Sequence, residues 1–149
     1  MLKFGIVSNI NEKQATARVQ FSDNDGIPSY WLPVLQAKTL KDKFYILPDI
    51  GEQVVCLMDE NLEDGVILGA IYSEADTCPV FSKDKITAKF SDGTSIEIDK
   101  KLGSLSVTVK DFNLNGKFIL NGINIAELFN SHTHNETDSV TQAPNQRLV

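Results

Sequence analysis

The sequence has few of the residues on which cross-links and metal sites usually depend. Its 149 residues include two cysteines, two histidines and one tryptophan. Cys56 lies in the apolar run VVCLM and Cys78 in an unrelated context, which excludes a disulfide framework and a zinc site of paired cysteines. We therefore expect Cys56 to be a small buried hydrophobic residue, and the chain to be made and folded in a cytoplasm.

Basic residues and long apolar runs are also scarce. The chain has 14 Lys and Arg against 20 Asp and Glu, which gives a net charge of −6 and a pI near 4.8. Phosphate binding needs clustered cations, so we expect no nucleic-acid partner. No apolar run reaches the ~18 residues that a membrane-spanning helix needs. The N-terminal segment MLKFGIVSNI lacks the cleavage site of a signal peptide.

What the sequence does contain is a series of short apolar runs typical of β-strands. A hydrophobic content of 42% fits a globular protein. Residues 36–47 are the one segment for which a helix is expected. Five short strands with one insert after the third predict a small closed barrel of the OB type over residues 1–76. The runs are Phe4–Ile10, Thr16–Phe21, 31–35, QVVCLMD and GVILGAIYS.

The character of the sequence changes after the fifth run. Residues 77–85 are predicted to be a linker, and residues 86–134 a β segment. From Ile86 to Ile125 it alternates apolar and polar side chains with breaks at Gly, Asp and Asn. The triplet Leu-Asn-Gly occurs at 114–116 and again at 120–122, a short-period repeat of the kind found in stacked β structures. Residues 135–149 are a polar tail that we expect to lie near the end of this segment.

The alternating segment has one apolar strand face and no second layer to cover it. A lone sheet of this kind is marginally stable in water, and a single-chain solenoid needs several coils to bury its interior. We therefore expect several copies of the chain to wrap together as the walls of a β-prism. Each copy turns its apolar face inward and its polar face toward water.

Both histidines, His132 and His134, lie one residue apart near the end of the chain. In a strand they would project to the same side. A dimer would supply four imidazoles, which suits tetrahedral zinc, and a trimer would supply six, which suits octahedral Fe(II). Most often, the two histidines of such a pair are simply solvated or hydrogen-bonded and bind no metal. An amidohydrolase metal site also begins with H-x-H, but it needs further ligands on a barrel of roughly 250 residues.

Four stretches of the chain resemble the baseplate assembly protein V family, the trimeric tail spikes of contractile-tailed phages and related bacteriocin particles. The most specific part is P-x-I-G-E-x-V followed by G-V-I-L-G-A-I-Y. The resemblance implies an N-terminal OB-fold collar followed by an intertwined trimeric β-helix spike. It also implies one Fe²⁺ per trimer, held near the tip by six histidines that map onto His132 and His134. The stretches are FGIVSNINEKQATARVQF, SYWLPVL, LPDIGEQVVCLMDENLEDGVILGAIYS and SHTHNETDSVTQAP.

The function that the resemblance implies is structural and not enzymatic. Such a homotrimer pierces the host cell envelope transiently from the tip of the tail baseplate in the virion, after assembly in the bacterial host cytoplasm. Its expected partners are the baseplate hub and tail tube proteins. Some members carry calcium and chloride, to which no residue here can be matched, and the lysozyme-like insertion of some related spikes is missing, so cell-wall digestion is not indicated.

The sequence is also compatible with two functions other than that of a phage spike. The spike of a type VI secretion-like apparatus is the first, although such spikes usually end a much longer chain. An OB-fold ligand-binding module is the second, because OB folds bind single strands through aromatic side chains flanked by basic residues. The candidate aromatic residues are Phe21, Tyr30, Trp31, Phe44 and Tyr45.

Overall fold

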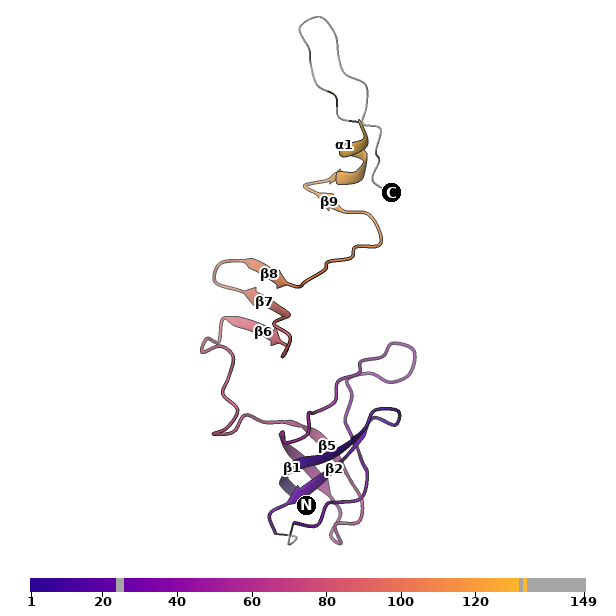
Figure 1. Cartoon of the computed structure of the whole chain (residues 1–149), viewed down its shortest axis with the longest axis vertical. Coiled ribbons are helices and arrows are strands. Elements are labelled where there is room, and N and C mark those ends of the chain that lie inside the picture. Colours follow the sequence, from indigo (N-terminus) through magenta and orange to yellow (C-terminus); the bar gives the residue numbers. More distant parts are fainter. Residues whose placement is uncertain (24–25, 132, 134–149) are drawn as a thin grey trace, which may run out of the picture. The chain divides into compact units, whose positions relative to one another are not determined.

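The computed structural model describes residues 1–23, 26–131 and 133. The chain divides into two compact units, Met1–Phe81 and a second unit that begins at Ser82 (Figure 1). Apart from one short helix, the regular structure of the described residues in both units is β. Within the described part of the chain, no helix is long and apolar enough to cross a membrane.

The first unit is a five-stranded sheet whose two edges meet. The strand order is β3-β2-β1-β4-β5, and all neighbours in it are antiparallel. A parallel bridge between Val34 and Ile67 joins the β3 and β5 edges, and the Leu35 N–H donates to the Ile67 carbonyl at 2.9 Å. This nearly closed barrel is consistent with an OB fold, and its five strands confirm the five that the sequence predicts. They are β1 (Leu2–Asn11), β2 (Thr16–Phe21), β3 (Leu32–Pro33), β4 (Gln53–Met58) and β5 (Gly65–Ala70).

The core of the barrel follows from the two-residue alternation of side chains along its strands. Gly5 shows how tightly the wall is packed, because a Cβ atom there would lie 2.5 Å from Val19 Cγ1 and 2.6 Å from the Gln20 carbonyl oxygen. Glycine therefore lets β1 approach β2 closely at this point. The buried hydrophobic residues are Val7, Ala17, Val19, Phe21, Leu32, Val54, Cys56, Met58 and Ile67.

The two cysteines differ sharply in accessibility, as the sequence predicts for Cys56. Cys56 is fully buried and Cys78 is exposed. Burial raises the pKa of the Cys56 thiol to about 11, which disfavours the reactive thiolate near neutral pH. We expect a thiol-specific reagent at pH 8 to label Cys78 rapidly, and to label Cys56 only in denaturant. Cys78→Ser should remove the rapid phase, and a native protein with two rapidly reacting thiols would contradict this packing.

The helix expected at residues 36–47 is absent, and the segment is an irregular loop. The side-chain amide of Gln36 accepts the Ile46 N–H at 3.0 Å and donates to the Ile46 carbonyl at 2.9 Å. These bonds occupy backbone groups that a helix would use. Pro48 also disfavours helical backbone at Leu47. The prediction of a helix here was therefore wrong.

The second unit contains a three-stranded antiparallel sheet, β6-β7-β8, made of β6 (Lys85–Lys89), β7 (Ser95–Asp99) and β8 (Ser104–Thr108). Its register places Ile98 opposite both Ile86 and Leu105, and Glu97 opposite Thr87 and Ser106. Apolar side chains therefore share one face of the sheet and polar side chains share the other, as the alternation predicts. The intertwined trimeric β-helix stays a prediction.

The last described elements are a hairpin and a helix. β9 (Ile119–Leu120) and β10 (Ile123–Asn124) are joined by Asn121-Gly122, whose φ angles of 50° and 82° are typical of a type I′ turn. The alternation expected through Ile125 is wrong beyond β10, because α1 (Ile125–Ser131) begins there. Asn124 explains the change. Its Oδ1 accepts the Ala126 N–H at 3.2 Å and its Nδ2 donates to Glu127 at 2.9 Å, which caps the helix.

Candidate functional site

The predicted metal ligands His132 and His134 lie outside the described residues. The element that precedes them is the helix α1, which ends at Ser131. The segment leading to the pair is therefore helical, and the strand expected for the pair itself stays a prediction. Over residues 1–23, 26–131 and 133, no cluster of three or more His, Cys, Asp or Glu could hold a metal ion. The described part of the chain therefore offers surfaces, and not a metal centre, as its candidate functional sites.

The apolar face of the β6-β7-β8 sheet is uncovered in the single chain. Its large side chains are between 42% exposed, at Ile98, and 66% exposed, at Leu105. Among the described residues of the second unit, no hydrophobic side chain is buried. An exposed apolar surface of this extent marks an interaction site. The face consists of Ile86, Ala88, Ile96, Ile98, Leu105 and Val107.

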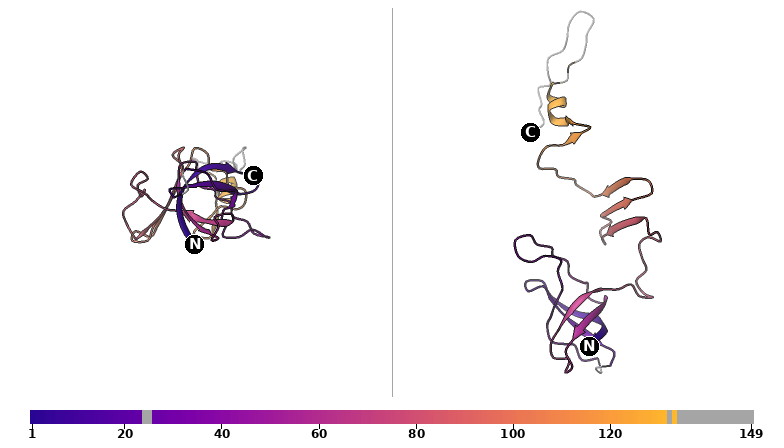
Figure 2. Two further views of the ribbon diagram at one scale, coloured as in Figure 1. Left: turned by 90° about the horizontal axis from the view of Figure 1, so that it is seen from below. Right: turned by 180° about the vertical axis from the view of Figure 1, so that it is seen from behind.

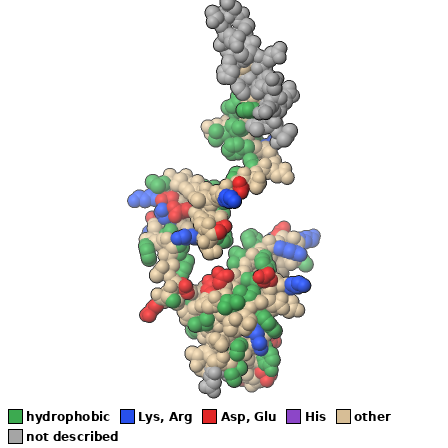
Figure 3. Space-filling view, in the orientation of Figure 1, with side chains coloured by type: hydrophobic (Ala, Val, Ile, Leu, Met, Phe, Trp, Pro, Cys, Tyr) green, Lys and Arg blue, Asp and Glu red, His purple; other side chains and the backbone are tan. Residues whose placement is uncertain are grey.

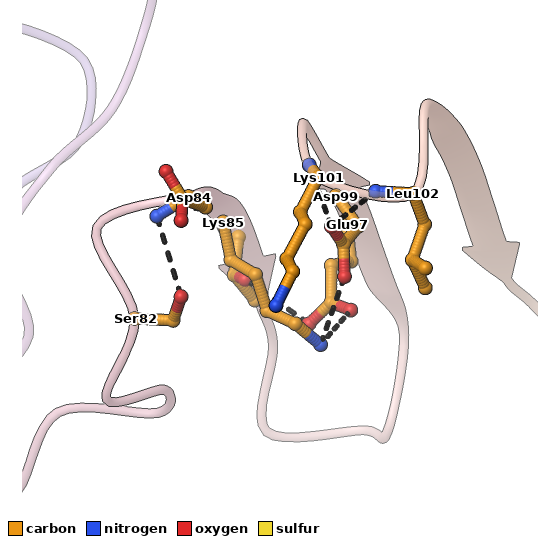
Figure 4. Close-up of polar contacts among 8 residues, drawn as sticks. Ser82, Asp84, Lys85, Glu97, Asp99, Lys101 and Leu102 are labelled. Atoms are coloured by element: carbon orange, nitrogen blue, oxygen red, sulfur yellow. Dashed lines mark hydrogen bonds and ion pairs between the residues drawn. The ribbon is translucent and has the colours of Figure 1, made fainter.

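The polar face of the same sheet carries a network of ion pairs and hydrogen bonds within one chain (Figure 4). Lys85 Nζ donates to Glu97 at 2.7 Å and lies 3.8 Å from Asp99. The hydrogen bond to Glu97, together with the two nearby carboxylates, raises the pKa of Lys85. Asp99 also accepts the N–H groups of Lys101 and Leu102 at 2.9 and 3.0 Å, which closes the β7–β8 turn. The apolar face is therefore the one that lacks a partner.

The aromatic residues considered for ligand binding do not form one platform. Phe21 is only 2% exposed and belongs to the barrel core. Trp31 is partly covered by Arg18, whose guanidinium carbon lies 5.7 Å from the ring centroid. Tyr45 lies in the 36–47 loop, where its hydroxyl donates to the Glu12 carbonyl at 2.9 Å. A single-stranded ligand requires exposed aromatic rings for stacking. Phe21 is therefore not available for stacking, and Arg18 already covers part of Trp31.

Comparison with known families now decides the class of the first unit. Residues 3–72 match the family model of the type VI secretion system/phage-baseplate injector OB domain. The first unit belongs to this injector family. The match confirms the resemblance to the baseplate assembly protein V family found in the sequence. No curated protein matches the chain.

The match of the first unit to the injector OB-domain family supports a broad role for the chain. The family is structural, which supports a role in a baseplate or spike and a place in the tail or baseplate of the particle. In such a role the chain associates with other tail or baseplate components. The matched residues end at 72, so the apolar face of β6-β7-β8 lies outside the injector OB domain.

Proposed function

We propose that this protein is the homotrimeric, membrane-piercing spike at the tip of a contractile phage tail or phage-like particle. The observation that carries the proposal is the uncovered apolar face of the β6-β7-β8 sheet. Three copies that turn this face toward a common axis bury it, and they leave the satisfied Lys85–Glu97–Asp99 network toward water. The second unit then forms the intertwined β-helix, and the injector OB domain forms its collar.

The histidine pair fits a metal at the tip by its donor chemistry. His132 and His134 give each chain two imidazoles, and three chains bring six together. Imidazole is a good ligand for Fe²⁺, so these residues would hold one ion shared by the trimer. The ion supplies a cross-link between the three chain ends. Calcium or chloride in the spike has no assigned residue.

The proposed role of the spike is mechanical and requires no catalysis. A spike driven through an outer membrane must resist bending and must not fray at its end. A close-packed apolar interior has low compressibility, which supplies stiffness. The terminus of a β structure opens first, and a shared metal ion there opposes opening because it binds the folded form. The baseplate hub and tail tube are its lasting partners, and the host envelope is met transiently.

Native mass spectrometry with parallel metal analysis tests the proposal directly. We expect a trimer that carries about one iron for every three chains, because six imidazoles from three chains complete the site. Light scattering on the same sample should give the same oligomeric state over a wide dilution range. A well-folded monomer would contradict the proposal, since it would leave the apolar face in water.

A further inference from the structure

The loop at residues 36–47, here called the basic loop, stands out from the rest of the acidic chain. Lys38, Lys41 and Lys43 outnumber its one acidic residue, Asp42, so the loop carries a charge of +2 (3 − 1). Its apolar side chains are also exposed, with Leu40 at 83%. The space-filling view shows Lys or Arg and hydrophobic side chains gathered on the first unit where this loop projects (Figure 3).

The basic loop is held in a fixed conformation although its side chains face water. The Gln36 amide is bonded to both backbone groups of Ile46, and the Phe44 N–H donates to the Lys38 carbonyl at 3.0 Å. The hydrogen bond from Tyr45 to Glu12 ties the loop to the β1–β2 turn. A preorganised loop loses little entropy on binding, and exposed aliphatic and aromatic side chains on it are typical of an interface.

A second segment has the complementary chemistry. Residues 72–81, here called the acidic linker, contain Glu74 and Asp76 and no Lys or Arg, a charge of −2. Tyr72 is 62% exposed and Phe81 is 92% exposed. The ion pairs among the described residues include none between the basic loop and the acidic linker. Within one copy, the basic loop and the acidic linker therefore do not form ion pairs with each other.

Both segments lie at the same end of the barrel. The basic loop contacts the β1–β2 turn through Glu12, and the acidic linker begins where the Ile71 N–H donates to the Gln53 carbonyl at 2.9 Å, at the start of β4. Further views show the loop and the start of the linker leaving this end on different sides (Figure 2). The chain leaves the barrel here for the second unit. In a trimer joined through second units, three copies of both segments therefore gather around the axis.

We propose that the basic loop of one copy docks on the acidic linker of the neighbouring copy. The inference rests on the proposed trimer and adds the surface by which the collars contact each other. Such a contact is heterologous, and three of them close a ring. The most acidic segment of the barrel, residues 59–64, follows Met58 at the opposite end, where the Met58 N–H donates to the Met1 carbonyl. Contacts between opposite ends displace each copy along the axis, which favours an open filament over a closed trimer.

A zero-length carbodiimide cross-linker tests the contact on the full chain without altering it. The reagent joins a lysine amine to a carboxylate only when the two already touch. After reaction, denaturing electrophoresis separates covalent monomers, dimers and trimers, and peptide mass spectrometry identifies the joined residues in each band. We expect links from Lys41 or Lys43 to Glu74 or Asp76 in the dimer and trimer bands only. The link between Lys38 and Asp42, which pair within one loop, should occur in every band.

A matched variant, Lys41→Arg with Lys43→Arg, keeps the charge and removes the reactive amines. It should lose the loop–linker links while light scattering still reports a trimer. If the protein is a trimer but its interchain links join the loop to residues 59–64, or none reach the linker, this docking is wrong and the proposed spike still holds. If the protein is a monomer, the proposed function and the docking fail together.

Discussion

Replacing Ile98 by lysine should convert the proposed trimer into dissociated or aggregated chains. Ile98 lies at the centre of the apolar face, opposite Ile86 on one side and Leu105 on the other. In the proposed assembly this face is dry, and an unpaired charge buried there costs several kcal/mol per copy. Three copies place three such charges near one axis, so the total cost is comparable with the ~5–15 kcal/mol that stabilises a typical domain.

The matched control for this variant is Ser106→Lys on the polar face. Ser106 lies opposite Glu97, so an added lysine there faces water and a carboxylate. Light scattering should report a trimer for Ser106→Lys and a monomer or aggregates for Ile98→Lys. Thiol labelling separates local from global failure, because Cys56 in the first unit should stay protected in both variants. A stable Ile98→Lys trimer would show that another surface holds the chains together.

The barrel could be predicted from the sequence because its signals are local and repeated. Each strand from β1 to β5 has an inward apolar face, and the turns between them are rich in Gly, Asp and Asn. The 36–47 loop could not be predicted, since its conformation depends on bonds between residues ten apart, such as Gln36 and Ile46. The Lys38–Asp42 pair, at a helical spacing of four, supports the wrong local conclusion.

The end of the alternating segment shows a missed signal of a different kind. Asn121-Gly122 is a strong hairpin signal, and Asn124 with Glu127 three residues later is a capping pattern that predicts a helix start. The alternation of Ile123 and Ile125 matches a strand equally well, and the two local patterns therefore conflict at this point. The two Leu-Asn-Gly triplets also prove unequal, because 120–122 forms the hairpin turn whereas 114–116 lies outside the strands.

The candidate surface was predictable in its chemistry but not in its partner. Period-two alternation fixes which side chains share a face, and the register of β6, β7 and β8 agrees with it at every pair. The alternation does not say what covers that face, because in the proposed trimer the covering atoms belong to other chains. The structure adds that these apolar side chains are exposed in a single copy. A single copy buries no hydrophobic residue in the described part of its second unit, so the proposed trimer would supply the apolar burial that this part lacks on its own.

Removing either histidine should abolish iron binding. In the proposed shared site, His132→Ala or His134→Ala takes away three of six ligands at once, because each change occurs in every copy. The iron content should fall from about one ion per trimer to background. Thr133→Ala, between the two, removes no ligand and should keep its iron. A His132→Ala, His134→Ala double variant that kept its iron would show that the ligands lie elsewhere.

The stability of the proposed trimer should depend on the metal in the wild-type protein and not in the alanine variants. An ion present at ~1,000 times its dissociation constant adds about 4 kcal/mol to the form that binds it, so a chelator should lower the temperature at which the wild-type trimer dissociates. Imidazole binds metal only when neutral, so sufficient acidification should displace the ion and act like the chelator. In the alanine variants, neither the chelator nor the acid should lower the dissociation temperature by removing metal, since these variants have no ion to lose. Equal chelator sensitivity in wild type and double variant would place the stabilising ion away from His132 and His134.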